Sequence, residues 1–160
     1  MKSEIELLLG LLDEGFDSRS WHGPNLRGAV RGVSAREAAW RPGADRHNIW
    51  EFTLHAAYWK YVVRRRLSDE KRGSFALKGS NFFLRPAGDA SEKAWHADIT
   101  LLIEEHERLR AVVKAFPARR LAERAKSSKW TNLETIRGIA AHDLYHAGQI
   151  QLLKRLARQR

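Results

Sequence analysis

Apolar side chains recur along the chain at intervals of three and four residues, the spacing of one buried face of an α-helix. Four segments carry this pattern: Glu4 to Phe16, about Asn48 to Leu67, about Ser91 to Phe116, and Thr131 or Asn132 through Leu153. The third is the most regular, with alternating steps of four and three residues along Trp95, Ile99, Leu102, His106, Leu109, Val113 and Phe116. Because no segment alternates as a strand does, we predict an all-α protein, a four-helix bundle forming one domain over residues 1–160.

Capping residues and helix breakers place the helix ends. Ser3 and Glu6 have the spacing of a capping box, and Pro117 ends the third helix. Long connections follow the first and second helices. The first connection, from about residue 17 to 47, contains a short helical candidate at residues 34–37. The second is interrupted by four turn-forming residues, Gly73, Gly79, Pro86 and Gly88. Its aromatic side chains are expected to pack over one end of the bundle: Phe75, Phe82 and Phe83.

Composition narrows the chemistry that is available. The chain has 160 residues, 43% of them hydrophobic and 30% charged, which is typical of a globular domain. It contains no cysteine, so any metal must be held by His, Asp or Glu. The apolar runs are too short to span a membrane, and Glu4 and Glu6 interrupt the region where a signal peptide needs an apolar stretch. We therefore expect a cytoplasmic protein without a membrane partner.

The formal net charge of +10 raises the alternative of a nucleic-acid-binding protein. The basic residues, however, gather at predicted helix ends and in connections, where Lys and Arg are solvated and complement the helix dipole. No basic motif interleaved with aromatic residues accompanies them. We interpret the charge as a basic surface and rank a nucleic-acid-associated stress protein last among the functions considered.

Three histidines lie on predicted core faces. His142 and His146 are four residues apart on the last helix, so both imidazoles can reach one ion. His55 lies on the inward face of the second helix, where an imidazole without a partner would be costly. Together they predict a site for one divalent transition metal per chain (Zn, Ni or Fe), with one coordination position left open. The alternative for each is a hydrogen-bonded histidine of the core.

Two segments resemble the DinB/YfiT-like superfamily of metal-dependent enzymes: the second-helix segment ending at His55, and the segment from His142 to Ile150. The resemblance extends over nearly the whole chain. It implies a four-helix bundle with up-down-down-up topology, often dimeric, and it implies His55, His142 and His146 as the metal ligands. The family also includes transferases and hydrolases that use a low-molecular-weight thiol.

Four further residues are candidates for the site. His106, on the third helix, is a candidate fourth ligand, general base or substrate contact, or else a core histidine bonded to a carboxylate. His22 lies in a Gly-Pro turn that could fold over the bundle mouth, although a loop histidine is more often solvated. Glu51 and Asp143 could orient a ligand imidazole, or simply lie on a helix flank.

These observations favour a metal-dependent transferase or hydrolase acting on a small molecule, with a low-molecular-weight thiol as a candidate cofactor. The alternative is a protein that binds a metal or small ligand without catalysis. We also expect a homodimer, because a helical face of a small bundle can pair with its own copy.

Overall fold

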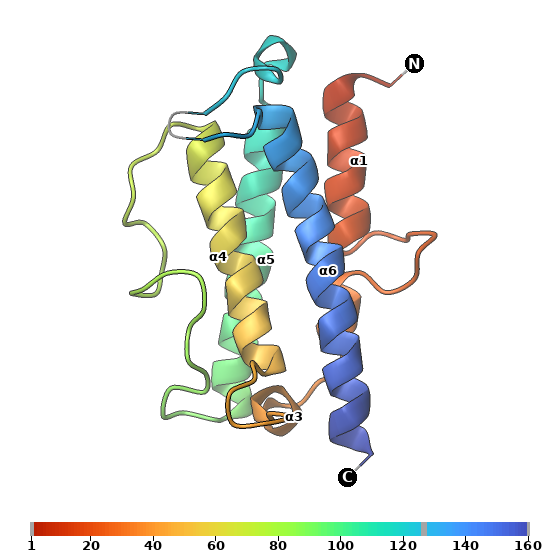
Figure 1. The fold of residues 1–160 in the computed structure, drawn as a ribbon, viewed down its shortest axis with the longest axis vertical. Coiled ribbons are helices and arrows are strands. Elements are labelled where there is room, and N and C mark those ends of the chain that lie inside the picture. Colours follow the sequence, from red (N-terminus) through yellow and green to blue (C-terminus); the bar gives the residue numbers. More distant parts are fainter. Residues whose placement is uncertain (1, 126–127, 160) are drawn as a thin grey trace.

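The computed structural model describes residues 2–125 and 128–159, and its long elements are four helices packed side by side (Figure 1). These are α1 (Glu4–Phe16), α4 (Ile49–Leu67), α5 (Glu92–Lys114) and α6 (Asn132–Arg158). The shorter elements are α2 (Leu26–Val30), α3 (Ala35–Ala39) and the 3-10 helix η1 (Ala118–Arg120). The described residues contain no strand, only one isolated bridge between Arg124 and Thr131. The predicted all-helical bundle is confirmed.

The long helices begin where their capping residues predict. At the first turn of α1, the Ser3 side chain accepts from the Glu6 amide and the Glu6 carboxylate accepts from the Ser3 amide, forming a complete capping box. Thr131 and Glu134 form the same box at α6. Asn48 caps α4. Each of these contacts satisfies an amide that has no partner within its helix.

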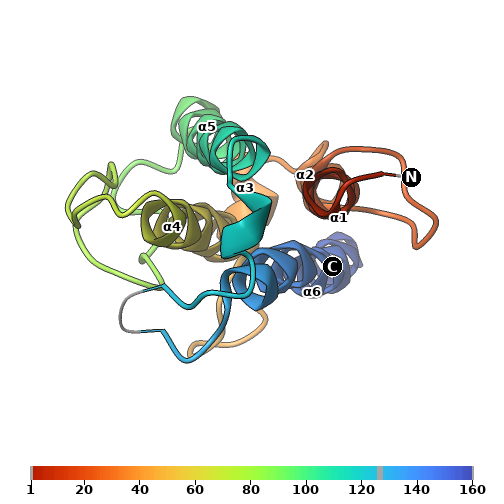
Figure 2. The same ribbon diagram turned by 90° about the horizontal axis from the view of Figure 1, so that it is seen from above.

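Helix directions explain the long connection after α4. Figure 1 shows α1 and α6 running one way along the bundle and α4 and α5 running the other. The starts of α4 and α5 lie together, since the Trp50 indole donates to the Asp98 carboxylate at 2.7 Å. A chain leaving the end of α4 must therefore return along the whole bundle to begin α5, and residues 68–91 do so beside α4. Seen from above, α4 and α1 each lie between α5 and α6 (Figure 2).

This route corrects the expectation that the aromatic residues of the connection cover one end of the bundle. Phe75 and Phe83 instead pack on the flank of α4, with ring centroids 5.3 and 5.6 Å from that of Tyr58. Phe82 stacks on His55 at a centroid distance of 4.0 Å. The connection thus forms a wall along α4 because the two helices it joins are parallel.

The core consists of two apolar clusters with buried polar residues between them. One cluster surrounds Trp50 and Trp95 near the start of α4. The other surrounds Leu109 and Ile136 near its end. Between the clusters, α4, α5 and α6 also carry buried polar side chains: His55, Lys60, Glu105, His106, Asp143 and His146. Among the described residues, no helix is long and apolar enough to cross a membrane.

Candidate metal centre

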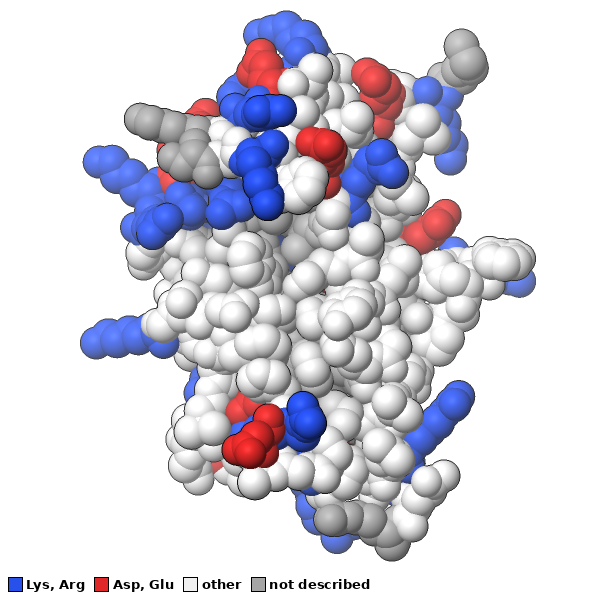
Figure 3. All heavy atoms as spheres, viewed as in Figure 1, with Lys and Arg blue, Asp and Glu red and all other residues white. Residues whose placement is uncertain are grey.

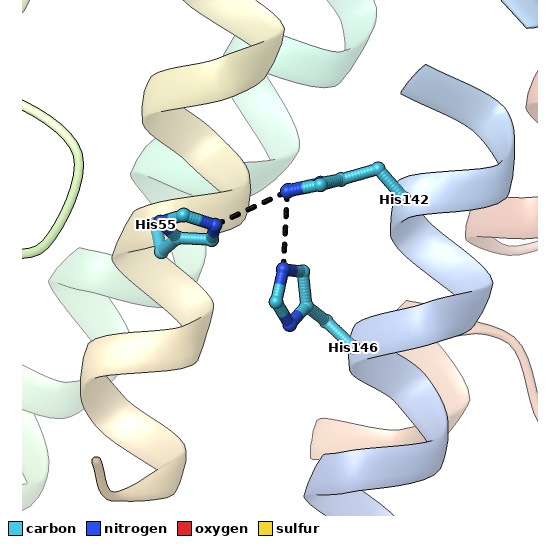
Figure 4. Close-up of side chains that lie close together, drawn as sticks. All are labelled: His55, His142 and His146. Carbon is cyan, nitrogen blue, oxygen red and sulfur yellow. Dashed lines mark hydrogen bonds between the residues drawn. The ribbon is translucent and has the colours of Figure 1, made fainter. Parts of the chain in front are cut away.

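Three histidine side chains converge in this polar layer, as the sequence predicts (Figure 4). His55 comes from α4, and His142 and His146 come from successive turns of α6. The Nε2 atom of His142 lies 3.1 Å from that of His55 and 3.0 Å from that of His146. Two nitrogens that bind one zinc ion tetrahedrally at about 2.0–2.1 Å are about 3.3–3.4 Å apart. A small adjustment of the rings would bring these atoms to that spacing.

Hydrogen bonds on the far side of two rings fix their orientation. The Nδ1–H of His55 donates to the backbone carbonyl of Asn81 at 3.0 Å. The Nδ1–H of His146 donates to the Gln149 side-chain oxygen at 2.6 Å. With the proton on Nδ1, each ring presents the lone pair of Nε2 toward the centre. This is the tautomer that binds a metal through Nε2, supported by the outer contacts that metal-ligating histidines usually make.

The three imidazoles have too few ring protons to satisfy both short contacts between their Nε2 atoms, which favours a cation at the centre. His55 and His146 both direct an Nε2 lone pair at the Nε2 atom of His142, as Figure 4 shows. One N–H on His142 can donate to only one of them, so at least one short contact would join two lone pairs. A metal ion accepts all three lone pairs and removes this conflict. The donor set therefore fits the predicted divalent transition metal.

Burial keeps the three rings neutral, the form in which imidazole binds a metal. Desolvation is the first cause that lowers the pKa of His55 to about 4 and that of His142 to about 3. The pKa of His146 is lowered for the same reason, in part offset by its hydrogen bond with Gln149. At neutral pH the site thus offers three uncharged nitrogens.

A cavity of about 540 Å³ opens between α4 and α6 beside His142. Of the three histidines, only His142 lines it. On the opposite side, the Phe82 ring is sandwiched against both His55 and His47, with centroids 4.0 and 3.6 Å away. The centre is therefore closed on the His55 side and accessible on the His142 side.

Glu51, predicted to orient an imidazole, does so for none of the three ligands. Its buried carboxylate pairs with the Arg41 guanidinium, contacts His47 Nδ1 at 2.8 Å and accepts from the Arg85 amide at 3.2 Å. These contacts bind the two long connections to the start of α4. Arg41 and His47 together hold the pKa of Glu51 below its ordinary value, against the effect of burial.

Asp143 pairs with Lys60 of α4 rather than with a ligand histidine, and both side chains are fully buried. The Oδ1 atom of Asp143 and the Nδ1 atom of the adjacent His142 hydrogen-bond to no described residue. Burial raises the pKa of Asp143 to about 6, and Lys60 acts in the opposite direction. The pair joins α4 to α6 beside the three histidines without contacting their Nε2 nitrogens.

The two remaining candidates lie apart from the three ligands. His106 is buried against Phe16, with ring centroids 3.7 Å apart and planes 11° apart, and its Nδ1 has no described partner. It is neither bonded to a carboxylate nor part of the three-histidine group. His22 is exposed and lines a different cleft, together with Gly148 and Leu152 of α6.

Sequence reasoning missed the residues that orient the ligands. Gln149 lies three residues after His146 on the same helix, so helical spacing could have indicated it. The contact from Asn81 is a backbone carbonyl, which every residue type possesses and which leaves no sequence signal. Asn81 itself adopts a φ of 65°, a conformation that asparagine tolerates well, and its side chain accepts from the Trp59 indole at 3.0 Å.

The fold and the centre define a class: helical bundles that build a metal site in their core from histidines on facing helices. The chain belongs to the DinB superfamily, whose family model matches residues 20–150 and so includes all three histidines. The resemblance noted from the sequence is thereby confirmed. Comparisons with curated proteins and with solved structures give no match.

Proposed function

We propose that this protein is a metal-dependent enzyme, a transferase or hydrolase, that holds one divalent transition metal through His55, His142 and His146. The observation that carries this proposal is the combination of three convergent Nε2 atoms with a cavity that is lined by His142. Three protein ligands with an accessible fourth position are typical of catalytic sites, whereas structural sites are closed by a fourth side chain.

A metal held by these three histidines would supply Lewis-acid chemistry, which lowers the pKa of a bound water or low-molecular-weight thiol. The chain's own residues orient the histidine rings and shield one side of the centre. The Asn81 carbonyl and Gln149 hold two of the rings in the binding tautomer. Phe82 covers His55 and excludes water from that side. A small molecule can reach the centre through the cavity between α4 and α6.

Elemental analysis of protein purified without a metal-affinity tag tests the site. We expect about one transition metal per chain, lost on substitution of any ligand: His55→Ala, His142→Ala or His146→Ala. His96→Ala is the matched control, since His96 is an exposed histidine on α5 and should leave the metal content unchanged. A wild-type protein that takes up no Zn, Ni or Fe would refute the proposal.

The nature of the nucleophile is tested on protein loaded with Co²⁺, whose visible spectrum reports a change of ligands. A thiol that enters the open position should change this spectrum in the wild type. Thiol-transfer assays would then follow, and hydrolysis assays if thiols leave the spectrum unchanged. A metal-loaded protein whose spectrum responds to no added small ligand would instead support a non-catalytic metal-binding protein.

A further inference from the structure

The cavity beside His142 has a basic end that the metal chemistry does not explain. It is lined by Arg66 near the end of α4 and by Arg137 near the start of α6. Figure 3 shows Lys and Arg side chains gathered over the part of the molecule where α4 ends and α6 begins, while the middle of this face carries few charges. Two guanidinium groups therefore face one cavity from the two helices that supply the metal ligands.

Neither guanidinium has a partner among the described residues. Within the described residues, Arg66 and Arg137 form no hydrogen bond and no ion pair, unlike Arg64 and Arg110, which bind carboxylates. Glu134 also lines the cavity, but its carboxylate caps α6 through both the amide and the hydroxyl of Thr131, each at 2.8 Å. Arg137 lies near enough to help lower the pKa of Glu134, yet it does not bind it.

Between the basic end and His142 the wall of the cavity is apolar. Trp59 and Val63 contribute from α4, and Ile139 contributes from α6. Trp59 also borders the metal centre, since its ring lies 6.4 Å from that of His142. From His142 outward, the cavity therefore presents a histidine of the metal centre, an apolar segment and two arginines that have no partner in the described part of the chain.

The rise of α6 between Arg137 and His142 gives the approximate scale of a matching ligand. Arg137 precedes His142 by five residues, which corresponds to about 7.5 Å along α6. A saturated chain of about six bonds spans that length on α6; Arg66 follows His55 by eleven residues, about 16.5 Å along α4, so its long side chain must point back toward His55 to bind the same ligand. Arginine binds carboxylate and phosphate groups through its fork of N–H donors, so the group expected at this end is an anion.

We propose that the substrate or co-substrate is a small organic anion whose carboxylate or phosphate binds Arg66 and Arg137 while its apolar portion lies against Trp59 and Ile139. This inference rests on the proposed function, because it assigns the far end of the ligand to the open position beside His142. It identifies the two arginines as residues that determine specificity and leaves the reaction itself unchanged.

Titration of metal-free protein with three six-carbon probes tests the inference: hexanoate, hexyl phosphate and 1-hexanol. Binding is followed by tryptophan fluorescence, since Trp59 and Trp130 line the cavity, and by calorimetry in physiological salt. At least one of the two anions should bind about tenfold more tightly than the alcohol. The tighter of the two distinguishes a carboxylate from a phosphate ligand.

Substitutions then locate the charge that is responsible. Arg66→Gln and Arg137→Gln should each weaken anion binding about three- to tenfold and leave 1-hexanol binding unchanged. Arg155→Gln is the matched control, because Arg155 is an exposed arginine of α6 that lines the other cleft. Equal binding of the alcohol and both anions, no saturable binding, or an equal loss in Arg155→Gln would overturn the inference.

These outcomes are separable from those of the proposed function because the titration is done without metal. A protein that binds metal but does not prefer anions would refute the inference alone. A protein that binds no metal but prefers anions through Arg66 and Arg137 would refute the catalytic function and leave an anion-binding cavity.

Discussion

His106 should make the metal-free protein sensitive to acid. Its side chain is 3% exposed, stacks on Phe16 and donates no hydrogen bond from Nδ1 to a described residue. Burial is the main reason that its pKa falls to about 2, and the positive charges of Lys60 and Arg110 add to the effect. A second proton would place a positive charge on a buried ring whose Nδ1 has no described partner.

The size of the stability loss follows from the difference between the pKa of His106 in the folded protein and its pKa in the unfolded chain. With an unfolded pKa of 6.5 and a folded pKa of about 2, the unfolded chain alone binds this proton between those two values. The contribution to stability is therefore complete above pH 6.5 and is lost as the pH falls below it. The slope approaches about 1.4 kcal/mol per pH unit, so lowering the pH from 7 to 5 removes about 2 kcal/mol through His106 alone.

Urea unfolding of chelator-treated protein at pH 7 and pH 5 measures this loss. Wild type should lose more than 2 kcal/mol, because the lowered pKa values of His55 and His142 act in the same direction. His106→Leu should lose about 2 kcal/mol less than wild type between the two pH values. Its stability at pH 7 should be unchanged or higher, since leucine removes a buried polar atom that lacks a partner.

His96→Gln is the control, because it removes an exposed histidine from the same helix. If His106→Leu loses as much stability as wild type, the assignment of His106 as a neutral core residue is wrong. Metal content tests whether His106 is a fourth metal ligand. We expect the His106→Leu variant to retain its metal, whereas a fourth ligand would not permit this.

The contacts around the ligands give two further predictions. Gln149→Leu removes the acceptor that fixes the His146 ring, so metal affinity measured by competition with a chelator should fall about 10- to 100-fold while the fold persists; unchanged affinity would show that the hydrogen bond is dispensable. Lys60→Met should lower the free energy of unfolding, measured in urea, by about 3–5 kcal/mol, because it leaves Asp143 buried without its partner. The double variant Lys60→Met/Asp143→Leu should recover most of that loss. Additive losses in the double variant would contradict this account of the pair.

Helical periodicity was sufficient to predict the four long helices and the three histidines that converge between α4 and α6. Ser3, Asn48, Ser91 and Thr131 each cap the helix expected to follow them. Such features are local, because an apolar stripe and a capping residue act within a few turns of one chain segment. The convergence of His142 and His146 is likewise set within one helix. To place His55 beside them, it was enough to predict that its own helix packs against the last helix.

Contacts between distant segments were not predictable in the same way. Glu51 carries the residue type and position expected of a group that orients an imidazole, yet Arg41 and Arg85 bind it from the two connections. Its role depends on where those connections run, and their length and glycine content allow many paths. The placement of Phe82 against His55 depends in turn on the parallel direction of α4 and α5.

The polar layer shows why the position of a residue on a core stripe does not define its role. His55, His106 and His146 all lie on inward stripes, and all are buried. Two of them receive an acceptor at Nδ1 and direct Nε2 toward His142, whereas His106 stacks on an apolar ring. His142 reaches the same centre with no described partner at its Nδ1, but for His55 and His146 the partner behind the ring selects the tautomer that directs Nε2 inward. That partner is a backbone carbonyl for His55 and a neighbouring side chain for His146, so only the second could be read from the spacing of residues along a helix.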